Sequence, residues 1–353
     1  MYLGIGLCCL LGIVATWLGG LQHIIGAPMI GMFLGILLAN WVSPGFLNKI
    51  KSGAAFSSKV ILRLGIILCG GTLSFTTIVG AGAGALPYII LSIAFAFITA
   101  CLVGKYLIRV STNTRIMVAG GTSICGGTAI ATLAAVLDAD EDEMAYAMTA
   151  IFLFDILATL MWPYVALALK LSPSQFSILA GIAINDVASV TAAGATYDSL
   201  LGAAAVSASG VTGGELAVVV KLTRVVMLVF VALAVMAWSV WNKRRIQGEG
   251  SVDTSGSARK VLKAFPVFIL GFLGLAVLNT IADFSGIGLF GTTLAAILKK
   301  ANKYLITVAL VGVGCKINLR DLFTKGIKPV LLGGCTWGVV ALTTFTYVTV
   351  FMK

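Results

Sequence analysis

Residues 116–137 read IMVAGGTSICGGTAIATLAAVL, an apolar stretch with four glycines in eight consecutive positions. A stretch of about 20 apolar residues matches one crossing of a bilayer. Each glycine weakens a helix by about 1 kcal/mol relative to alanine, so Gly126 and Gly127 predict a break halfway along. Thr128 is then expected to be the N-cap of a second half-helix, whose free amides and positive dipole end attract anions. The alternative is an unbroken helix that packs closely through its small residues.

The rest of the chain also has the composition of a membrane protein. Of its 353 residues, 59% are hydrophobic and 10% are charged, whereas soluble domains carry about 25% charged residues. Lipid accommodates such a chain because each helix satisfies its own backbone hydrogen bonds. We therefore predict an all-α polytopic protein, a single transmembrane domain over 1–353, surrounded by lipid in the bacterial cell membrane. Its eleven apolar segments lie near 2–20, 24–41, 57–78, 86–104, 116–137, 144–169, 177–207, 215–241, 264–283, 302–317 and 329–351.

Lysine and arginine concentrate in alternate loops, which predicts the orientation. With the N-terminus inside and the C-terminus outside, the basic loops, including 105–115, are cytoplasmic, as the positive-inside rule requires. The acidic run 138–143 then falls outside, and residues 286–301 form an amphipathic lead-in rather than a span. The Gly- and Ser-rich stretch 246–258 is predicted to be a flexible cytoplasmic linker. The net charge of +11 follows from these loops, so we expect no nucleic-acid partner.

Two further patterns predict an inverted-repeat transporter. Residues 60–82 align with 304–326, and the predicted orientations of these segments are opposite, as inverted repeats require. Segment 177–207 is too long for one straight span and contains Asn185-Asp186 about a third of the way along. We expect a bent or re-entrant helix with a polar elbow there, and therefore discontinuous helices near both 116–137 and 177–207.

Ionisable residues at membrane depth are candidates for function because each costs some 2.5–3.5 kcal/mol to insert. Asp155 and Asp186 lie within apolar segments, and Lys221 and Arg224 lie three residues apart on one helix face. Arg63 is a further deep cation. The alternatives are a loop position for Asp186, snorkelling of Arg63 to the interface, and structural salt bridges from Lys221 and Arg224 to the acids.

These residues define a candidate site between the two predicted breaks. Asp155 and Asp186 are assigned to proton or ion coupling. The predicted substrate-binding residues are Thr122, Ser123, Cys125, Gly126, Gly127, Thr128, Asn185, Ser189, Lys221 and Arg224.

Other classes of function find little support in the sequence. The seven cysteines are scattered through apolar stretches and His23 is the sole histidine, so we expect no metal site and no cofactor. We find no nucleophile–base spacing, which argues against an enzyme. The absence of a nucleotide-binding loop argues against an ATP-driven pump.

Five stretches occur together in the order seen in one known family. They are LRLGIILCG (62–70), GTSICGGTAI (121–130), NDVASVTAAG (185–194), KLTRVVML (221–228) and VGVGCKINLRDLFTKGIKPVLL (311–332). Over nearly its whole length the chain resembles the YeiH family, described as sulfate exporters and linked to sulfonate breakdown. The resemblance implies the inverted-repeat fold of sodium/proton antiporters and bile-acid symporters. One departure is that family members usually show a histidine before an acid where this chain has Asn185-Asp186, so Asp186 would carry any proton coupling alone.

The sequence thus predicts a secondary transporter that exports a small anion, such as sulfate or a sulfonate, across the cell membrane. The alternative is a cation/proton antiporter that uses Asp155 and Asp186. Three deep cations against two deep acids favour the anion. The direction of transport, the coupling ion and assembly into a homodimer stay open.

Overall fold

The computed structural model describes residues 1–21, 26–71, 73–207, 210–247, 267–284, 292–316 and 327–352. Within these ranges the chain is helical almost throughout, and the extended segments pair only in one isolated bridge, between Val206 and Thr212. Among the described residues, six helices are long and apolar enough to cross a bilayer. The all-α polytopic membrane fold is therefore confirmed.

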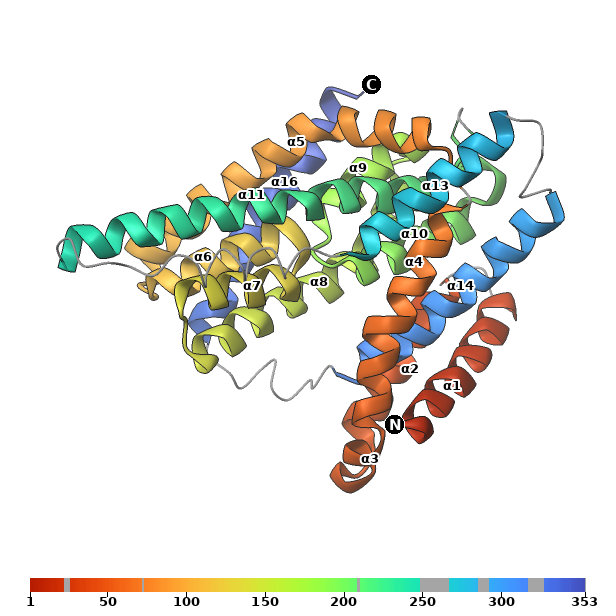
Figure 1. Ribbon diagram of the computed structural model, residues 1–353, viewed down its shortest axis with the longest axis horizontal. Helices are drawn as coiled ribbons and strands as arrows, with labels where there is room; N and C mark the ends of the chain where they lie inside the picture. Colours follow the sequence, from red (N-terminus) through yellow and green to blue (C-terminus); the bar gives the residue numbers. More distant parts are fainter. Residues whose placement is uncertain are drawn as a thin grey trace.

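The helices form two bundles, which lie side by side in Figure 1. The first bundle contains α1 (Tyr2–Leu21), α2 (Ala27–Trp41), α3 (Pro44–Phe56), the π-helix η1 (Ser57–Ile61), α4 (Leu62–Gly70), α13 (Phe268–Phe284) and α14 (Thr292–Gly314). The second contains α5 (Phe75–Leu102) with η2 (Val103–Leu107), α6 (Thr112–Gly120) with η3 (Gly121–Cys125), α7 (Gly127–Leu137), α8 (Glu141–Ala168), α9 (Pro173–Ala183), α10 (Val187–Leu201) with η4 (Gly202–Ala205), α11 (Gly213–Gln247) and α16 (Ile327–Val350). Across the boundary α10 packs on α2 and α14.

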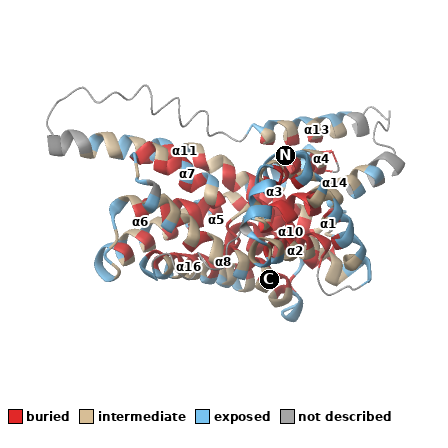
Figure 2. Ribbon diagram, turned by 90° about the horizontal axis from the view of Figure 1, so that it is seen from below, coloured by how far each residue is buried: buried red, intermediate tan, exposed pale blue. Residues whose placement is uncertain are grey.

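The core of the molecule lies around α10. Every residue from Val187 to Gly194 is buried, and Figure 2 shows buried residues gathered around this helix while exposed residues occupy the periphery. Exposed large apolar side chains such as Trp17 and Phe230 occur elsewhere on the surface, as expected for helices that face lipid. A helix buried on all sides at the centre is well placed to form part of a site.

Several predicted segment boundaries are corrected. The segment expected at 57–78 ends as α4 at Gly70, and the next begins as α5 at Phe75 rather than at 86. The reason is a cap, since the Ser74 hydroxyl accepts a hydrogen bond from the Thr77 amide at 3.2 Å. From Thr292 onward the predicted lead-in 286–301 is part of α14. The predicted linker 246–258 begins inside α11, and its remainder lies outside the described residues.

Segment 116–137 is broken as predicted, but it turns back instead of crossing. A Cβ placed on Gly121 would lie 2.9 Å from the Ile130 side chain, and one on Gly120 would meet Leu133. Residues nine or more apart along one straight helix could not approach so closely. The helix α6–η3 and the helix α7 are thus the antiparallel arms of a re-entrant hairpin, which we call the first hairpin.

Segment 177–207 also forms a re-entrant hairpin, the second hairpin, as the polar elbow predicted. Its arms are α9 and α10, and the extended residues 184–186 join them. Near its base the rings of Phe176 and Tyr197 stack with centroids 3.8 Å apart. The Tyr197 hydroxyl also donates to the Leu171 carbonyl at 2.8 Å.

The two hairpins enter from opposite faces of the molecule. The first has its base beside the 105–115 loop, since Asn113 Nδ2 donates to Glu143 Oε2 at 3.1 Å and Ser111 donates to the same carboxylate. The acidic run 138–143 therefore lies on the same face as 105–115, and its predicted position on the other face is wrong. The physical cause is the turn at Gly126, which returns the chain to the face it came from. Helix α8 then crosses to the opposite face, where the second hairpin begins.

Cysteine labelling distinguishes this topology from a simple crossing. We expect Thr112→Cys and Asp140→Cys to react with an impermeant maleimide from the same side of the membrane, and Ser174→Cys from the other side. The positive-inside rule places the 112 and 140 positions in the cytoplasm. Labelling of 112 and 140 from different sides would contradict the first hairpin.

Candidate functional site

The tips of the two hairpins meet at the centre of the second bundle. A Cβ on Gly126 would lie 3.7 Å from the Asp186 Cβ and 3.9 Å from the Asn185 carbonyl carbon. Gly126 makes the first turn with φ 62° and ψ −124°, a conformation that only glycine adopts readily. A π-helical turn, Gly121–Cys125, precedes it, and such turns recur at functional sites. Four helix ends therefore converge at one place.

Two buried cations on α11 cap the carbonyl ends at these tips. The Arg224 guanidinium donates to the carbonyls of Thr122, Ser123 and Ile182, and so joins the first arms of both hairpins. Lys221 Nζ donates to the Ile184 carbonyl at 2.6 Å. Both side chains are fully buried. Their hydrogen bonds go to backbone oxygens rather than to Asp155 or Asp186, and positive charge is favourable at helix C-termini.

Asp155 caps the amino end of α10 from the neighbouring helix α8. Its Oδ1 accepts hydrogen bonds from the Asn185 and Asp186 amides at 2.8 and 2.9 Å, and its Oδ2 accepts one from the Ser189 hydroxyl. Asp186 adds a cap of its own, since its Oδ2 accepts from the Ala188 amide at 3.1 Å. The two carboxylates lie where negative charge is favourable, at a helix N-terminus.

Among the described residues, the amino end of α7 is the one end of the four whose first two amides, those of Gly127 and Thr128, have no side-chain cap. Its N-cap residue is Gly126, so the predicted capping role of Thr128 is wrong, because the helix begins one residue earlier, at Gly127. Cys125 lies against the Ala129 amide. The described residues offer no hydrogen-bond acceptor to the amides of Gly127 and Thr128.

Unsatisfied polar side chains occur at the two hairpin tips. In the part of the chain that the structure describes, six buried side-chain nitrogen or oxygen atoms have no hydrogen-bond partner. Three of them belong to the tips: Thr122 Oγ1, Ser123 Oγ and Asn185 Oδ1. A buried polar group without a partner costs about 1–3 kcal/mol. Such a concentration indicates a site for a polar ligand or for water.

All twelve residues selected from the sequence lie on the tips or in contact with them, whereas Arg63 does not. Arg63 is exposed on α4 and its guanidinium carbon lies 5.9 Å from the centroid of the Phe268 ring. Trp337 on α16 was not expected at the tips, and its Nε1 donates to the Ala183 carbonyl at 2.9 Å and so holds the end of α9. The carbonyl partners of Lys221 and Arg224 were not predictable either, since backbone groups leave no signature in a sequence.

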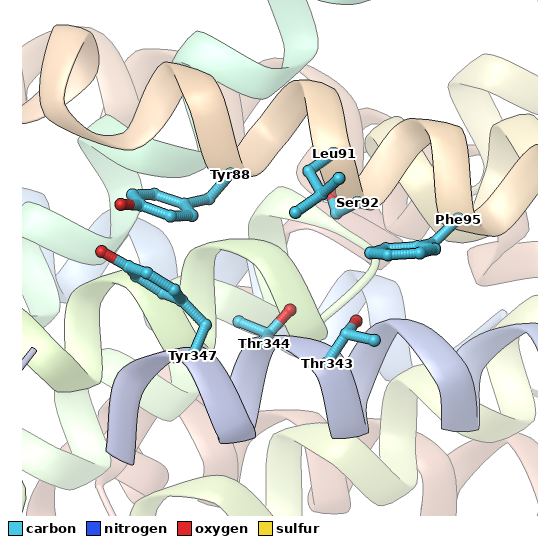
Figure 3. A pocket seen from close by; sticks show the side chains of 7 residues that line it. All are labelled: Tyr88, Leu91, Ser92, Phe95, Thr343, Thr344 and Tyr347. Carbon is cyan, nitrogen blue, oxygen red and sulfur yellow. The ribbon is translucent and has the colours of Figure 1, made fainter. Parts of the chain in front are cut away.

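A small hollow, shown in Figure 3, lies between α5 and α16 and is not a site of this kind. The rings of Tyr88 and Tyr347 stack across it, and the volume is about 20 Å³. The hydroxyls of Ser92, Thr343 and Thr344 all donate to carbonyls of their own helices. With these three hydroxyls satisfied and room for about one water, it is too small for a solute.

Comparison with known proteins shows the family. The model of the family "Conserved hypothetical protein 698" matches residues 3–333. The chain belongs to this family, whose members are UPF0324 membrane proteins. A UPF0324 membrane protein of Streptococcus pyogenes serotype M18 is 36% identical over 96% of this chain and 94% of its own length. One from Fusobacterium nucleatum is 33% identical over 96% and 95% of the two chains.

The UPF0324 family and the YeiH family that the motifs resemble are the same family. No solved structure matches the chain. The names of these UPF0324 relatives describe membrane proteins and give no substrate.

Proposed function

We propose that this UPF0324 protein is a secondary transporter that binds a small anion, such as sulfate or a sulfonate, at the uncapped amino end of α7. The observation behind the proposal is the group of unsatisfied polar atoms at the two tips. The amides of Gly127 and Thr128 point to negative charge because a helix N-terminus carries a partial positive charge. The hydroxyls of Thr122 and Ser123 supply further donors.

Lys221 and Arg224 have an indirect role in this proposal. Since they donate to the carbonyls of Ile184 and of the first tip, they fix the tips and add positive potential without contacting the anion. Asn185 reaches an anion by rotating its amide, because Nδ2 gives up only a 3.4 Å hydrogen bond to the Ile151 carbonyl. Opposed hairpins that meet near the midplane suit alternating access, since each tip is reached from one face.

Asp155 and Asp186 are the coupling residues in this proposal. A buried carboxylate beside a bound anion repels it unless a proton or a cation accompanies the anion. Export is the direction that the family resemblance implies. The alternative, a cation/proton antiporter, would use the same two carboxylates. It gives no role to the unsatisfied hydroxyls of Thr122 and Ser123.

Flux through reconstituted proteoliposomes tests the proposal. Radiolabelled sulfate or 2-hydroxyethanesulfonate should exchange across vesicles that contain the protein and not across empty ones. If neither anion moves while sodium or proton flux persists and depends on Asp155 and Asp186, the antiporter replaces the anion transporter.

Removing the unsatisfied hydroxyls should separate stability from transport. We expect Thr122→Val and Ser123→Ala to leave the unfolding temperature unchanged or higher, because each removes a buried group that costs about 1–3 kcal/mol when unpaired. Anion flux should fall, since the donors are lost. The control is Thr336→Val, which removes a buried hydroxyl bonded to the Leu332 carbonyl at 2.7 Å and should lower stability but keep flux. Wild-type flux in both Thr122→Val and Ser123→Ala would show that these hydroxyls are not part of the anion site.

A further inference from the structure

A cavity of about 280 Å³ lies between the two bundles, apart from the hairpin tips. Residues of α2, α4 and α14 form one wall, and residues of α10 and α11 form the other. It lies toward the face from which the second hairpin enters, since the base of α10 and the beginning of α11 line it. Ligand pockets have volumes of about 300–1,000 Å³, so this cavity suits a small solute.

The two walls carry opposite charges. Asp198 and Glu215 line the α10–α11 wall, whereas Lys303 lines the wall formed by α14. Lys303 is exposed, and Lys300, one turn away on the same helix, is exposed as well. Beside Lys303, the buried Oδ1 of Asn302 has no hydrogen-bond partner.

The acidic wall is held in a fixed geometry. Asp198 Oδ1 accepts a hydrogen bond from the Gly214 amide at 3.0 Å. Glu215 and Thr212 form reciprocal caps at the beginning of α11, with both hydrogen bonds at 3.2 Å. The carboxylates thus stay in place at the cavity wall rather than moving with flexible side chains, which favours binding of a cationic group.

This charge pattern selects against simple ions. Among the described lining residues there are two carboxylates and one ammonium group, so a divalent anion is repelled more than it is attracted. A plain cation gains the Asn302 oxygen on the α14 wall but is repelled there by Lys303. A molecule with both an ammonium group and an anionic group satisfies both walls, and the Asn302 oxygen accepts a further N–H from it.

We propose that this cavity binds a small zwitterion, with its ammonium group toward Asp198 and its anionic group toward Lys303. The cavity continues along α10 to Thr191, which lies two residues beyond Ser189 of the second tip. A sulfonate that also carries an ammonium group is therefore the solute that the transporter admits at this face, a narrowing of the proposed function that also rests on it. Because the walls belong to different bundles, the bound solute also bridges them.

The test is ligand-induced thermal stabilisation of the purified full-length protein in detergent. The probes are 2-aminoethanesulfonate and 3-aminopropanoate as zwitterions, 2-hydroxyethanesulfonate and sulfate as anions, and ethylammonium as a cation. Both zwitterions should stabilise the protein at lower concentrations than the other probes. The half-maximal concentration should rise about tenfold in Asp198→Asn and in Lys303→Gln, as expected for the loss of one charged contact.

Both variants are designed to fold. Asparagine still offers an oxygen to the Gly214 amide, and Lys303 lies on the surface, so the unfolding temperatures without ligand should match the wild type. Stabilisation by sulfate that Asp198→Asn strengthens would show an anion site instead, and equal stabilisation by ethylammonium would show a cation site. Either result, or no zwitterion effect, overturns the proposal.

The two experiments distinguish failure of the zwitterion site from failure of the proposed transport function. Anion flux in proteoliposomes without any thermal stabilisation by zwitterions would support the transporter and contradict the zwitterion site in the cavity. The opposite result is stabilisation by zwitterions, weakened in Asp198→Asn and Lys303→Gln, without flux of any probe. It would support the binding site and contradict transport.

Discussion

Arg224→Met should abolish transport and lower the unfolding temperature more than any other single change at the tips. The substitution leaves the carbonyls of Thr122, Ser123 and Ile182 without their shared donor. Each buried carbonyl without a partner costs about 1–3 kcal/mol, and the total is a large part of the 5–15 kcal/mol that stabilises a typical protein. We expect both hairpin tips to separate, because Arg224 is bonded to each of them.

Arg224→Lys and Arg63→Ala are the matched controls. Lysine keeps the charge but lacks the planar fork that reaches three oxygens at once, so stability should recover in part while flux stays low. Arg63 is exposed on α4, so its loss tests the removal of a positive charge alone and should leave both quantities near wild type. The measurements are thermal unfolding in detergent and flux in proteoliposomes. A stable and active Arg224→Met would show that the carbonyls find other partners and that the tips do not depend on this cation.

Gly126→Ala should stop transport while the protein still inserts and folds. The added methyl group meets its nearest atoms at 3.7 Å, which is ordinary contact, so space is not the obstacle. The obstacle is the backbone, since alanine at φ 62° and ψ −124° costs about 1–3 kcal/mol. The tip should relax away from this conformation and carry the amides of Gly127 and Thr128 out of position. Flux should fall by a factor of about ten or more, because orientation at a binding site is sensitive to shifts of about 1 Å.

Gly202 provides a close control for the backbone. It has φ 56° and ψ −120° at the end of α10, far from the tips, and no atom lies within 4 Å of an added Cβ. Gly202→Ala should therefore cost similar stability and leave flux intact. Gly84→Ala, at a helical position with open space, should leave flux intact and raise stability by up to about 1 kcal/mol. If Gly126→Ala and Gly202→Ala reduced flux equally, the loss would reflect general strain and not the site.

The sequence by itself determined the membrane class, the places of the two breaks and the residues that gather there. Composition and segment length were sufficient for the class, because lipid imposes a strong constraint on apolarity. Gly126 and the pair Asn185-Asp186 marked the breaks because helix-breaking and buried polar residues are local signals. Asp155, Lys221 and Arg224 stood out because charge at membrane depth is rare.

Only the tertiary structure decided what these residues do. Whether a helix broken at Gly126 continues or turns back depends on its packing partners, such as Ile130 against Gly121, and no local pattern encodes that choice. The same holds for Arg224 and Lys221, whose partners are carbonyls supplied by other helices. The cavity between Asp198 and Lys303 exists only where the two bundles meet. Contacts between distant segments arise from the fold as a whole, and for that reason the charges were visible in the sequence while their partners were not.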